Sequence, residues 1–326
     1  LLRTIYLATS VTLGSALLAV PIAWLTVRSD LPMRRFWAIL TTLPLVVPSY
    51  VGAYLFISVL GPKGMLQKWL SPLGVEELPK LYGFSGAFLV LTLLSYPYIL
   101  TTTRASLMRM NPALEEASRN LGYGAWNTFF RVTLPQLRPG LAAGGLLVAL
   151  YVLRDFGAVS FMRYSTFTRV LYIQYQSSFD RTGAAILALV LILLSLLVLL
   201  IEIKTRGRAN YYGGHVGAVG NPIQIKLGYW RWPSLLFCST VVLLSLLLPA
   251  GILCFWLLRG MRIEMAFPSL WLSAYNSLIS SGLASIFILL AAIPVAWLSV
   301  RETGRIATFL ERVSYSAFAL PGMVVA

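Results

Sequence analysis

Charged residues are scarce in this sequence, and long apolar runs take their place. Only 11% of the 326 residues are charged, whereas 58% are hydrophobic. Soluble globular domains usually carry about a quarter charged residues, so the composition excludes that class. Because lipid offers backbone groups no hydrogen-bond partners, apolar chains of this kind cross membranes as helices. We therefore predict an all-α integral membrane protein.

Cysteine and histidine are almost absent as well. The two cysteines, Cys238 and Cys254, lie in one apolar run, and His215 is the single histidine. Their number excludes a disulfide framework, and no His, Cys or carboxylate residues recur at metal-ligand spacing. The phosphate-binding pattern GxxxxGK[ST] does not occur either. We therefore predict no metal, no cofactor and no catalytic residue, and we do not expect this chain to hydrolyse ATP.

Acidic residues are outnumbered by basic ones, 11 against 26. The Lys and Arg residues are dispersed between apolar runs, which argues against a nucleic-acid partner. They concentrate in alternate connections, as the positive-inside rule describes for cytoplasmic loops, and so predict a multi-pass protein in a lipid bilayer. The predicted cytoplasmic connections contain Arg28, Arg34 and Arg35, then Arg104 to Arg138, then Lys204 to Arg231, and then Arg301, Arg305 and Arg312.

Eight apolar runs are long enough to cross a bilayer, which takes about 20 residues. They cover residues 5–27, 36–60, 84–103, 140–161, 182–203, 233–258, 272–300 and 310–326. Prolines lie inside several of these runs, where neighbouring helices can satisfy the freed carbonyls. The prediction is about eight transmembrane helices.

The stretch from Asn111 to Pro139 is the longest charged interruption between these runs. Pro112 suits the first position of a helix. Glu115 and Arg119 have the spacing of an i,i+4 ion pair on that helix. Gly122 is suited to end the helix, because glycine adopts the left-handed conformation without penalty.

The same stretch predicts a small apolar face and a second short helix. The apolar face would consist of Leu114, Ala117, Ser118 and Leu121, which recur at spacings of three and four. The second helix would run over residues 125–134 and end at Pro135. Two short helices that are too polar to span a bilayer would form a docking surface for a soluble partner.

The spacing of this stretch resembles a known family signature. Inner-membrane permeases of ATP-binding-cassette (ABC) importers have a cytoplasmic loop that reads Glu-Ala-Ala, three residues, Gly, nine residues, Ile, one residue, Leu-Pro. At those spacings this sequence has Glu116, Ala117, Ser118, Gly122, Val132, Leu134 and Pro135. It departs from the signature by Ser for the second Ala and by Val for Ile.

The resemblance implies the fold of type I ABC importer permeases and a set of partners. We expect residues 104–139 to form a coupling loop that contacts the ATPase. Its contact residues would be Glu115, Glu116, Ala117, Ser118, Arg119, Gly122, Val132, Leu134 and Pro135. The expected partners are two copies of a cytoplasmic ABC ATPase, which would bind the ATP, and a periplasmic substrate-binding protein. The expected location is the bacterial inner membrane.

An internal repeat predicts a duplicated permease. PIAWLTVR, residues 21–28, aligns without gaps to PVAWLSVR, residues 294–301, with collinear matches on both sides. We expect residues 1–205 to be a first half that lacks its first span. Residues 206–232 would form a cytoplasmic linker, and residues 233–326 would begin a truncated second half. The chain would then be a fragment of a longer polypeptide.

The run from Val152 to Tyr175 contains the candidate substrate pathway, namely Arg154, Asp155, Tyr164 and Tyr172. Ionisable residues at membrane depth are costly and therefore often functional. A structural Arg/Asp pair and an interfacial aromatic belt are alternative interpretations of the same residues.

The sequence DFGAVS within this run resembles the corresponding sequence in the fused permeases of bacterial ferric iron importers. The resemblance implies ferric iron as the substrate. Thiamine, phosphonate, sulfate and polyamine permeases of the same class remain open, as do a gradient-driven transporter and a membrane scaffold.

Overall fold

The protein is helical wherever its structure is described. The computed structural model describes residues 1–62, 64–74, 81–110, 113–176, 181–206, 225–261 and 268–301. Within these ranges the sole β-type pairing is one isolated bridge between Ser29 and Ile225. The all-α prediction is confirmed. Residues up to Gly251 belong to one compact unit, and Ile252 begins a second unit.

Six helical stretches of the described chain are long and apolar enough to cross a membrane. In the first unit α1, α5 and α11 are continuous helices, whereas the helix ending in α8 begins in the coupling loop. The stretch through α12 begins in the first unit, and α14 belongs to the second. Their bounds are Leu2–Arg28 for α1, Phe84–Arg109 for α5, Leu134–Arg154 for α8, Arg181–Arg206 for α11, Arg231–Val242 for α12, Leu248–Met261 for α13 and Pro268–Arg301 for α14.

One further pair of helices is long and apolar enough to cross a membrane only when its two bent parts are taken together. The predicted span over residues 36–60 is instead α2 (Arg34–Leu40), a 3-10 turn at Leu43–Val46 and α3 (Ser49–Leu60), followed by α4 (Met65–Leu70). The two parts meet at 98°. Pro44 and Pro48 explain the break, because proline has no N–H and disfavours helical backbone in the residue before it. Val47 is accordingly extended, with ψ 114°. The predicted span over residues 310–326 lies outside the described residues.

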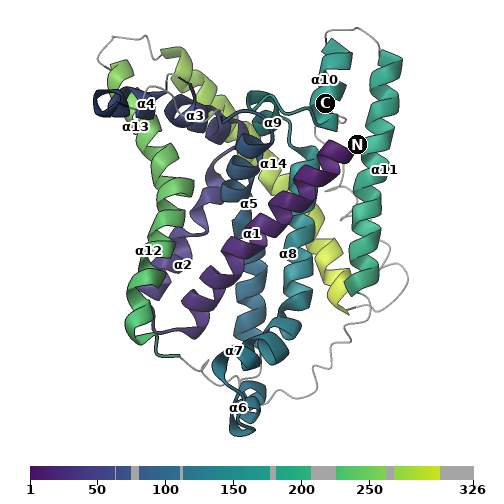
Figure 1. Ribbon diagram of the computed structural model, residues 1–326. Coiled ribbons are helices and arrows are strands. Elements are labelled where there is room, and N and C mark those ends of the chain that lie inside the picture. Colours follow the sequence, from purple (N-terminus) through teal and green to yellow (C-terminus); the bar gives the residue numbers. More distant parts are fainter. Residues whose placement is uncertain are drawn as a thin grey trace. The chain divides into compact units, whose positions relative to one another are not determined.

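The core of the first unit is the packing of α1, α5 and α8 (Figure 1). Fully buried apolar side chains come from all three helices. They include Leu7, Val11, Ile22, Leu91, Leu100, Leu107, Leu137 and Val148. Pro21 and Pro97 lie inside α1 and α5 without interrupting them. The candidate coupling loop lies near one end of these helices, and the candidate pocket lies near the other end.

The segment that leads into α12 is bound to the end of α1 by hydrogen bonds and an ion pair. The Ile225 N–H donates to the Arg28 carbonyl over 2.8 Å. The Leu227 N–H donates to Asp30 Oδ1 over 2.8 Å, and Arg231 forms an ion pair with the Asp30 carboxylate. These contacts hold the pKa of the Asp30 carboxyl below its usual value. Of the predicted linker, residues 207–224 lie outside the described part, and its last residues are docked on the first half.

The two copies of the repeat motif both lie in helices. Residues 21–28 end α1, and residues 294–301 form the described C-terminal part of α14. Each copy places a proline inside its helix, at Pro21 and at Pro294. The division into halves, predicted from the repeat, stays a prediction.

Close packing of α5 on α8 depends on Gly144. A Cβ at Gly144 would lie 2.4 Å from Thr102 Oγ1 and 2.7 Å from the Ile99 Cα, whereas one at Gly145 would meet Thr12 Cγ2 at 3.4 Å, an ordinary contact. We expect Gly144→Ala to cost about 1–3 kcal/mol, because the helices must move apart. Gly145→Ala should stay within about 0.5 kcal/mol of the unsubstituted protein. Thermal unfolding of the purified proteins in detergent tests this pair, and equal midpoints for both variants would contradict it.

Candidate coupling loop and membrane pocket

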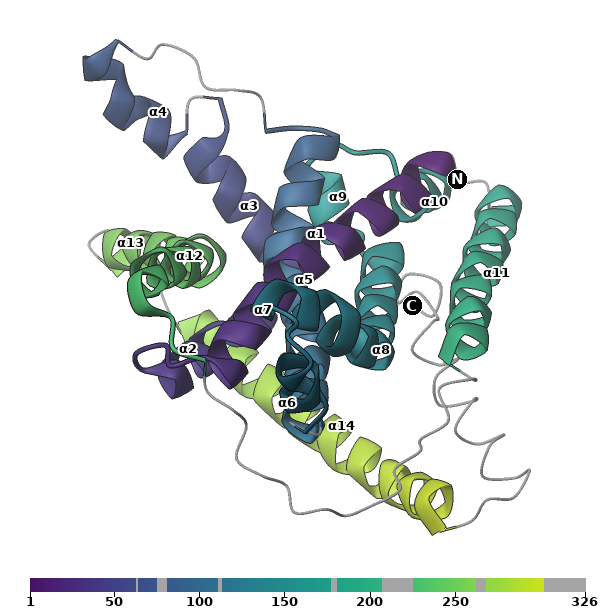
Figure 2. The same cartoon turned by 60° about the horizontal axis from the view of Figure 1, so that its bottom comes forward.

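The predicted coupling loop, residues 104–139, begins in the last turns of α5, and α6 (Ala113–Asn120) is the first separate helix within it. With α7 (Ala125–Thr128) it lies at one end of α5 and α8 (Figures 1 and 2). Its C-terminus is closed by two hydrogen bonds, from Gly122 N–H to the Arg119 carbonyl and from Tyr123 N–H to the Ser118 carbonyl. This pattern needs a left-handed residue, and Gly122 has φ +84°. The predicted glycine stop is confirmed, whereas Pro112 lies outside the described residues.

The face of α6 that packs inward is polar. Glu115 and Ser118 are 6% and 8% exposed, whereas Leu114 and Leu121 are 52% and 77% exposed. Of the predicted apolar face, only Ser118 is therefore buried. A prediction from periodicity places the more apolar face of a helix inward. Here the polar face is buried instead, because neighbouring helices provide hydrogen-bonding partners for it.

Those partners lie in the segment that leads into α8 and at the end of α1. The Thr133 hydroxyl donates to Glu115 Oε1 over 2.8 Å, and the hydroxyls of Ser118 and Thr128 are 3.0 Å apart. Glu115 Oε2 is 3.6 Å from Arg28 Nη1. In the described part of the chain, Glu115 therefore forms its ion pair with Arg28. The predicted ion pair between Glu115 and Arg119 is wrong.

The predicted second short helix is wrong at its C-terminal end. Residues 125–128 form α7, residues 129–133 form a π-helical turn, and α8 continues directly from Leu134. Pro135 directly follows the π-helical turn inside this continuous helix and does not end it. Local π-helical adjustment is one way in which a membrane helix accommodates a residue without an N–H. The coupling loop therefore runs without a break into the span that ends at Arg154.

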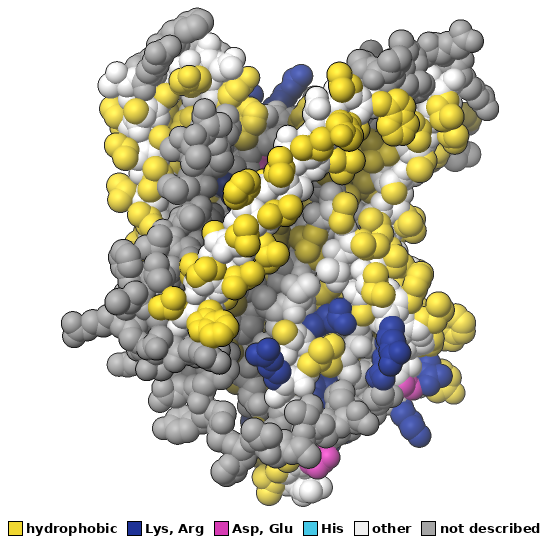
Figure 3. All heavy atoms as spheres, turned by 180° about the vertical axis from the view of Figure 1, so that it is seen from behind, with side chains coloured by type: hydrophobic (Ala, Val, Ile, Leu, Met, Phe, Trp, Pro, Cys, Tyr) yellow, Lys and Arg dark blue, Asp and Glu magenta, His cyan; other side chains and the backbone are white. Residues whose placement is uncertain are grey.

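The other predicted coupling residues divide by exposure. Glu116, Ala117, Arg119 and Gly122 are exposed. Val132, Leu134 and Pro135 are half-buried in the turn and at the start of α8. Most Lys and Arg side chains visible on one face of the molecule lie towards the end that contains α6 (Figure 3). This distribution agrees with the predicted cytoplasmic side of the loop.

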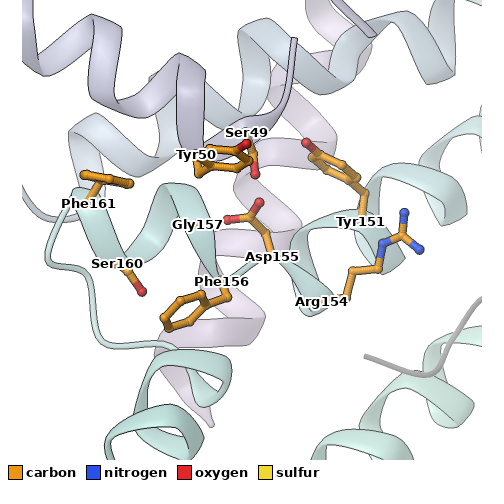
Figure 4. A pocket seen from close by; sticks show the side chains of 9 residues that line it. All are labelled: Ser49, Tyr50, Tyr151, Arg154, Asp155, Phe156, Gly157, Ser160 and Phe161. Atoms are coloured by element: carbon orange, nitrogen blue, oxygen red, sulfur yellow. The ribbon is translucent and has the colours of Figure 1, made fainter. Parts of the chain in front are cut away.

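A pocket of about 610 Å³ lies near the other end of the same helices (Figure 4). It is the end at which α8 finishes, at Arg154, and at which α1 begins. The start of α1 is held there by a hydrogen bond from the Tyr164 hydroxyl to the Arg3 carbonyl. The pocket lies between α3, the end of α8 and α9 (Gly157–Phe161). Its lining consists of Ser49, Tyr50, Tyr151, Arg154, Asp155, Phe156, Gly157, Ser160 and Phe161.

The pocket gathers oxygen atoms. In Figure 4 the side chains of Ser49 and Asp155 face each other, and the Tyr151 hydroxyl points to the same region. The Arg154 guanidinium points away from this group and lies 5.9 Å from the Tyr151 ring centre. The oxygen atoms of Ser49, Asp155 and Tyr151 thus form a small polar group in a pocket whose lining is otherwise largely apolar.

Asp155 also has a structural role. Its Oδ1 accepts hydrogen bonds from the N–H groups of Ala158, over 2.9 Å, and Val159, over 3.4 Å. Its carbonyl accepts the Thr168 hydroxyl over 2.7 Å. A carboxylate on free N–H groups at a helix start is a capping arrangement. Asp155 therefore caps α9, a structural role different from the Arg/Asp pair considered from the sequence, which stays a prediction.

The remaining two pathway candidates do not line the pocket. The Tyr164 ring packs edge-on against Phe84 at 5.9 Å. The Tyr172 ring lies 4.6 Å from the ring of Phe156, behind the pocket wall. The structure therefore brings Arg154 and Asp155 together at the pocket and leaves Tyr164 and Tyr172 outside its lining.

Sequence reasoning missed Arg28, Ser49 and Tyr151. Arg28 had a usable signal, because both copies of the repeat motif end in arginine. Ser49 and Tyr151 had none, since they are brought together only by the break between the 3-10 turn and α3 and by the packing of α3 near the end of α8.

Comparison with known proteins identifies the class. Residues 15–202 match the family described as "Binding-protein-dependent transport system inner membrane component". The chain belongs to this family, whose members are ABC importer permeases, non-enzymatic membrane components of transport systems. The matched region includes residues 104–139, the predicted coupling loop.

Individual relatives show which transport permeases this chain is similar to. The chain is 33% identical to the Fe(3+)-transport system permease protein FbpB 2 of Haemophilus influenzae over 99% of this chain and 61% of that protein, so it spans less than two thirds of that relative. It is 32% identical to the molybdenum transport system permease protein ModB of Escherichia coli K12 over 55% of this chain and 80% of that protein. A bacterial alginate ABC transporter structure matches with a TM-score of 0.51 and 16% identity, over 63% of this chain and 76% of that one. The predicted type I ABC importer permease fold is confirmed.

The left-handed residue at the end of α6 gives a test of the loop. Gly122→Val should loosen the helix end by about 1–2 kcal/mol, because a branched side chain resists positive φ. Gly122→Asn should be tolerated, since asparagine adopts this conformation more readily and nothing lies within 4 Å of a Cβ there. Hydrogen exchange of the Gly122 and Tyr123 amides should accelerate in the valine variant only. Unchanged protection with valine would refute the closure described above.

Proposed function

We propose that this chain is the permease of an ATP-driven importer for ferric iron in the bacterial inner membrane. Two copies of a separate cytoplasmic ABC ATPase bind and hydrolyse ATP, and a periplasmic binding protein delivers the substrate. The coupling loop converts closure of the ATPases into alternating exposure of the pathway. The chain itself contributes no cofactor and no catalytic residue to this cycle.

The observation that supports ATPase docking is the outward face of α6. Leu114, Ala117, Leu121 and Tyr123 are exposed, although three of them are apolar and one is aromatic; we call these four residues the docking surface. Leu114 and Ala117 lie on α6, and Leu121 and Tyr123 follow its C-terminus. An exposed apolar patch of this kind is typical of a protein interface. Because Glu115 and Ser118 hold the opposite face inward, the docking surface is presented in one fixed orientation.

The pocket supports a cation rather than an oxyanion as substrate. Hard oxygen ligands suit ferric iron, and the pocket offers the hydroxyls of Ser49, Tyr50 and Tyr151 beside Asp155. Its one guanidinium, on Arg154, points away from these oxygens. Sulfate or molybdate would be expected to meet donors such as arginine or backbone N–H groups. A relative that matches nearly the whole chain is a Fe(3+)-transport permease.

In this proposal the pathway residues have distinct roles. Asp155 and Arg154 lie at the pocket wall, with Asp155 also capping α9. Tyr172 supports the wall from behind through the ring of Phe156, whereas Tyr164 packs on Phe84 outside the lining. The iron contacts would be weak and transient, because conduction requires that the ion leave as readily as it enters.

The docking surface is tested by adding charge to it. Leu121→Asp in the complete polypeptide, reconstituted with its ATPase and binding protein, should lower substrate-stimulated ATP hydrolysis about tenfold or more, as loss of a central interface residue does. Ser71→Asp adds the same charge outside the loop and should leave stimulation unchanged. Membrane insertion of both variants is checked by fractionation. Full stimulation with Leu121→Asp would remove the role assigned to this surface.

The pocket is tested by removing hydroxyl groups. Uptake of radiolabelled ferric iron by the Ser49→Ala/Tyr151→Phe double variant should fall about twofold to tenfold, the range expected for loss of a polar contact. Tyr98→Phe is the matched control, because the Tyr98 ring centre lies 5.6 Å from that of Tyr151 but Tyr98 does not line the pocket. Asp155 is left intact, because its removal would uncap α9. Unchanged iron uptake, or uptake of molybdate in place of iron, would contradict the proposed substrate.

A further inference from the structure

Arg28, the last residue of α1, is enclosed in the protein. Its exposed fraction is 1%, and it is the largest of the fully buried side chains. Burying a guanidinium is unfavourable unless the cation is paired, so an enclosed arginine needs a reason. A partner protein cannot reach Arg28 from outside. Any role that it has in transport is exerted through other residues of this chain.

The partners of Arg28 connect four elements. Its Nη1 lies 3.6 Å from Glu115 Oε2 on α6, and its Nη2 donates to the Leu107 carbonyl on α5 over 3.4 Å. Glu115 in turn accepts the Thr133 hydroxyl from the turn that leads into α8. The end of α1 is thereby joined to α5, to the helix with the docking surface, and to the start of α8.

These contacts are incomplete. Within the described residues, Nε and Nη1 of Arg28 have no hydrogen-bond partner. The separation of 3.6 Å from Glu115 also exceeds the ~2.7–2.9 Å of a charge-assisted hydrogen bond. A small shift of α6 relative to α1 would therefore strengthen or break the pair. Coupling between two states requires such a contact, one whose strength differs between them.

The main chain of Arg28 extends the connection. Its carbonyl accepts the N–H of Ile225, in the segment that enters α12. Displacement of Arg28 would consequently move both α1 and that segment. The equivalent residue of the second repeat copy, Arg301, is again arginine.

We propose that Arg28 is a positioning residue for coupling. Its pairing with the buried carboxylate of Glu115 transmits displacement of α6 to α1, and so links ATPase contact to movement of the core helices. Neither residue touches the ATPase in this arrangement. The inference rests on the proposed function of the coupling loop, and it assigns to residues outside the docking surface the step that follows docking.

The test compares a single and a double substitution in the complete polypeptide, reconstituted with ATPase and binding protein. Arg28→Gln leaves Glu115 as an unpaired buried charge and should lower both the thermal unfolding midpoint and the stimulated ATPase. Arg28→Gln/Glu115→Gln removes both charges, so the unfolding midpoint should recover. Stimulation should nevertheless stay about tenfold below that of the unsubstituted protein, a typical size for a coupling effect. ATPase co-purification should be normal for the double variant.

Stimulation of the double variant at the unsubstituted level would overturn the proposal, since the pair would then serve stability alone. Arg28→Lys keeps the charge and should retain part of the stimulation, which a variant that merely fails to fold would not do. Arg35→Gln, an exposed arginine shortly after α1, is the matched control and should behave like the unsubstituted protein. If the unsubstituted protein binds no ATPase, the proposed function fails, whereas full coupling without the Arg28 pair refutes only the present inference.

Discussion

The Glu115 carboxylate lies inside the protein, and its pairing with Arg28 and Thr133 determines which face of α6 turns inward. A carboxylate in a low-dielectric site is stable only with partners, so the helix cannot rotate to bury its leucines instead. Leu114 and Leu121 are exposed as a consequence. The orientation of the docking surface therefore depends on two buried charges rather than on hydrophobic packing.

The core helices α1, α5 and α8 connect the coupling loop to the pocket. The segment that contains Thr133 continues into α8, and α8 ends at Arg154 beside the pocket. Close contact between α5 and α8, which Gly144 permits, makes this connection stiff. A shift at the coupling loop would reach the pocket through packed helices, without a flexible segment of the described chain between them.

Much of the fold could be predicted from the sequence, because long apolar runs have few alternatives in a bilayer. The break at Pro44 and Pro48 was not predicted, since Pro21 and Pro97 are tolerated inside helices and sequence alone does not distinguish the two outcomes. The position of Gly122 was predicted because positive φ has a clear residue preference. The inward face of α6 was not predicted from the sequence. Its Glu115 is buried because it pairs with Arg28, which lies 87 positions earlier in the chain.

The most direct test is site-specific photo-crosslinking from α6 in membranes that contain the complete transporter. A photoreactive amino acid at Leu121, on the exposed face, should capture the ATPase. The same group at Ser118, on the buried face, should capture only this chain, because its side chain is 8% exposed. Capture of the ATPase from Ser118 but not from Leu121 would contradict the orientation of the helix and the coupling role derived from it.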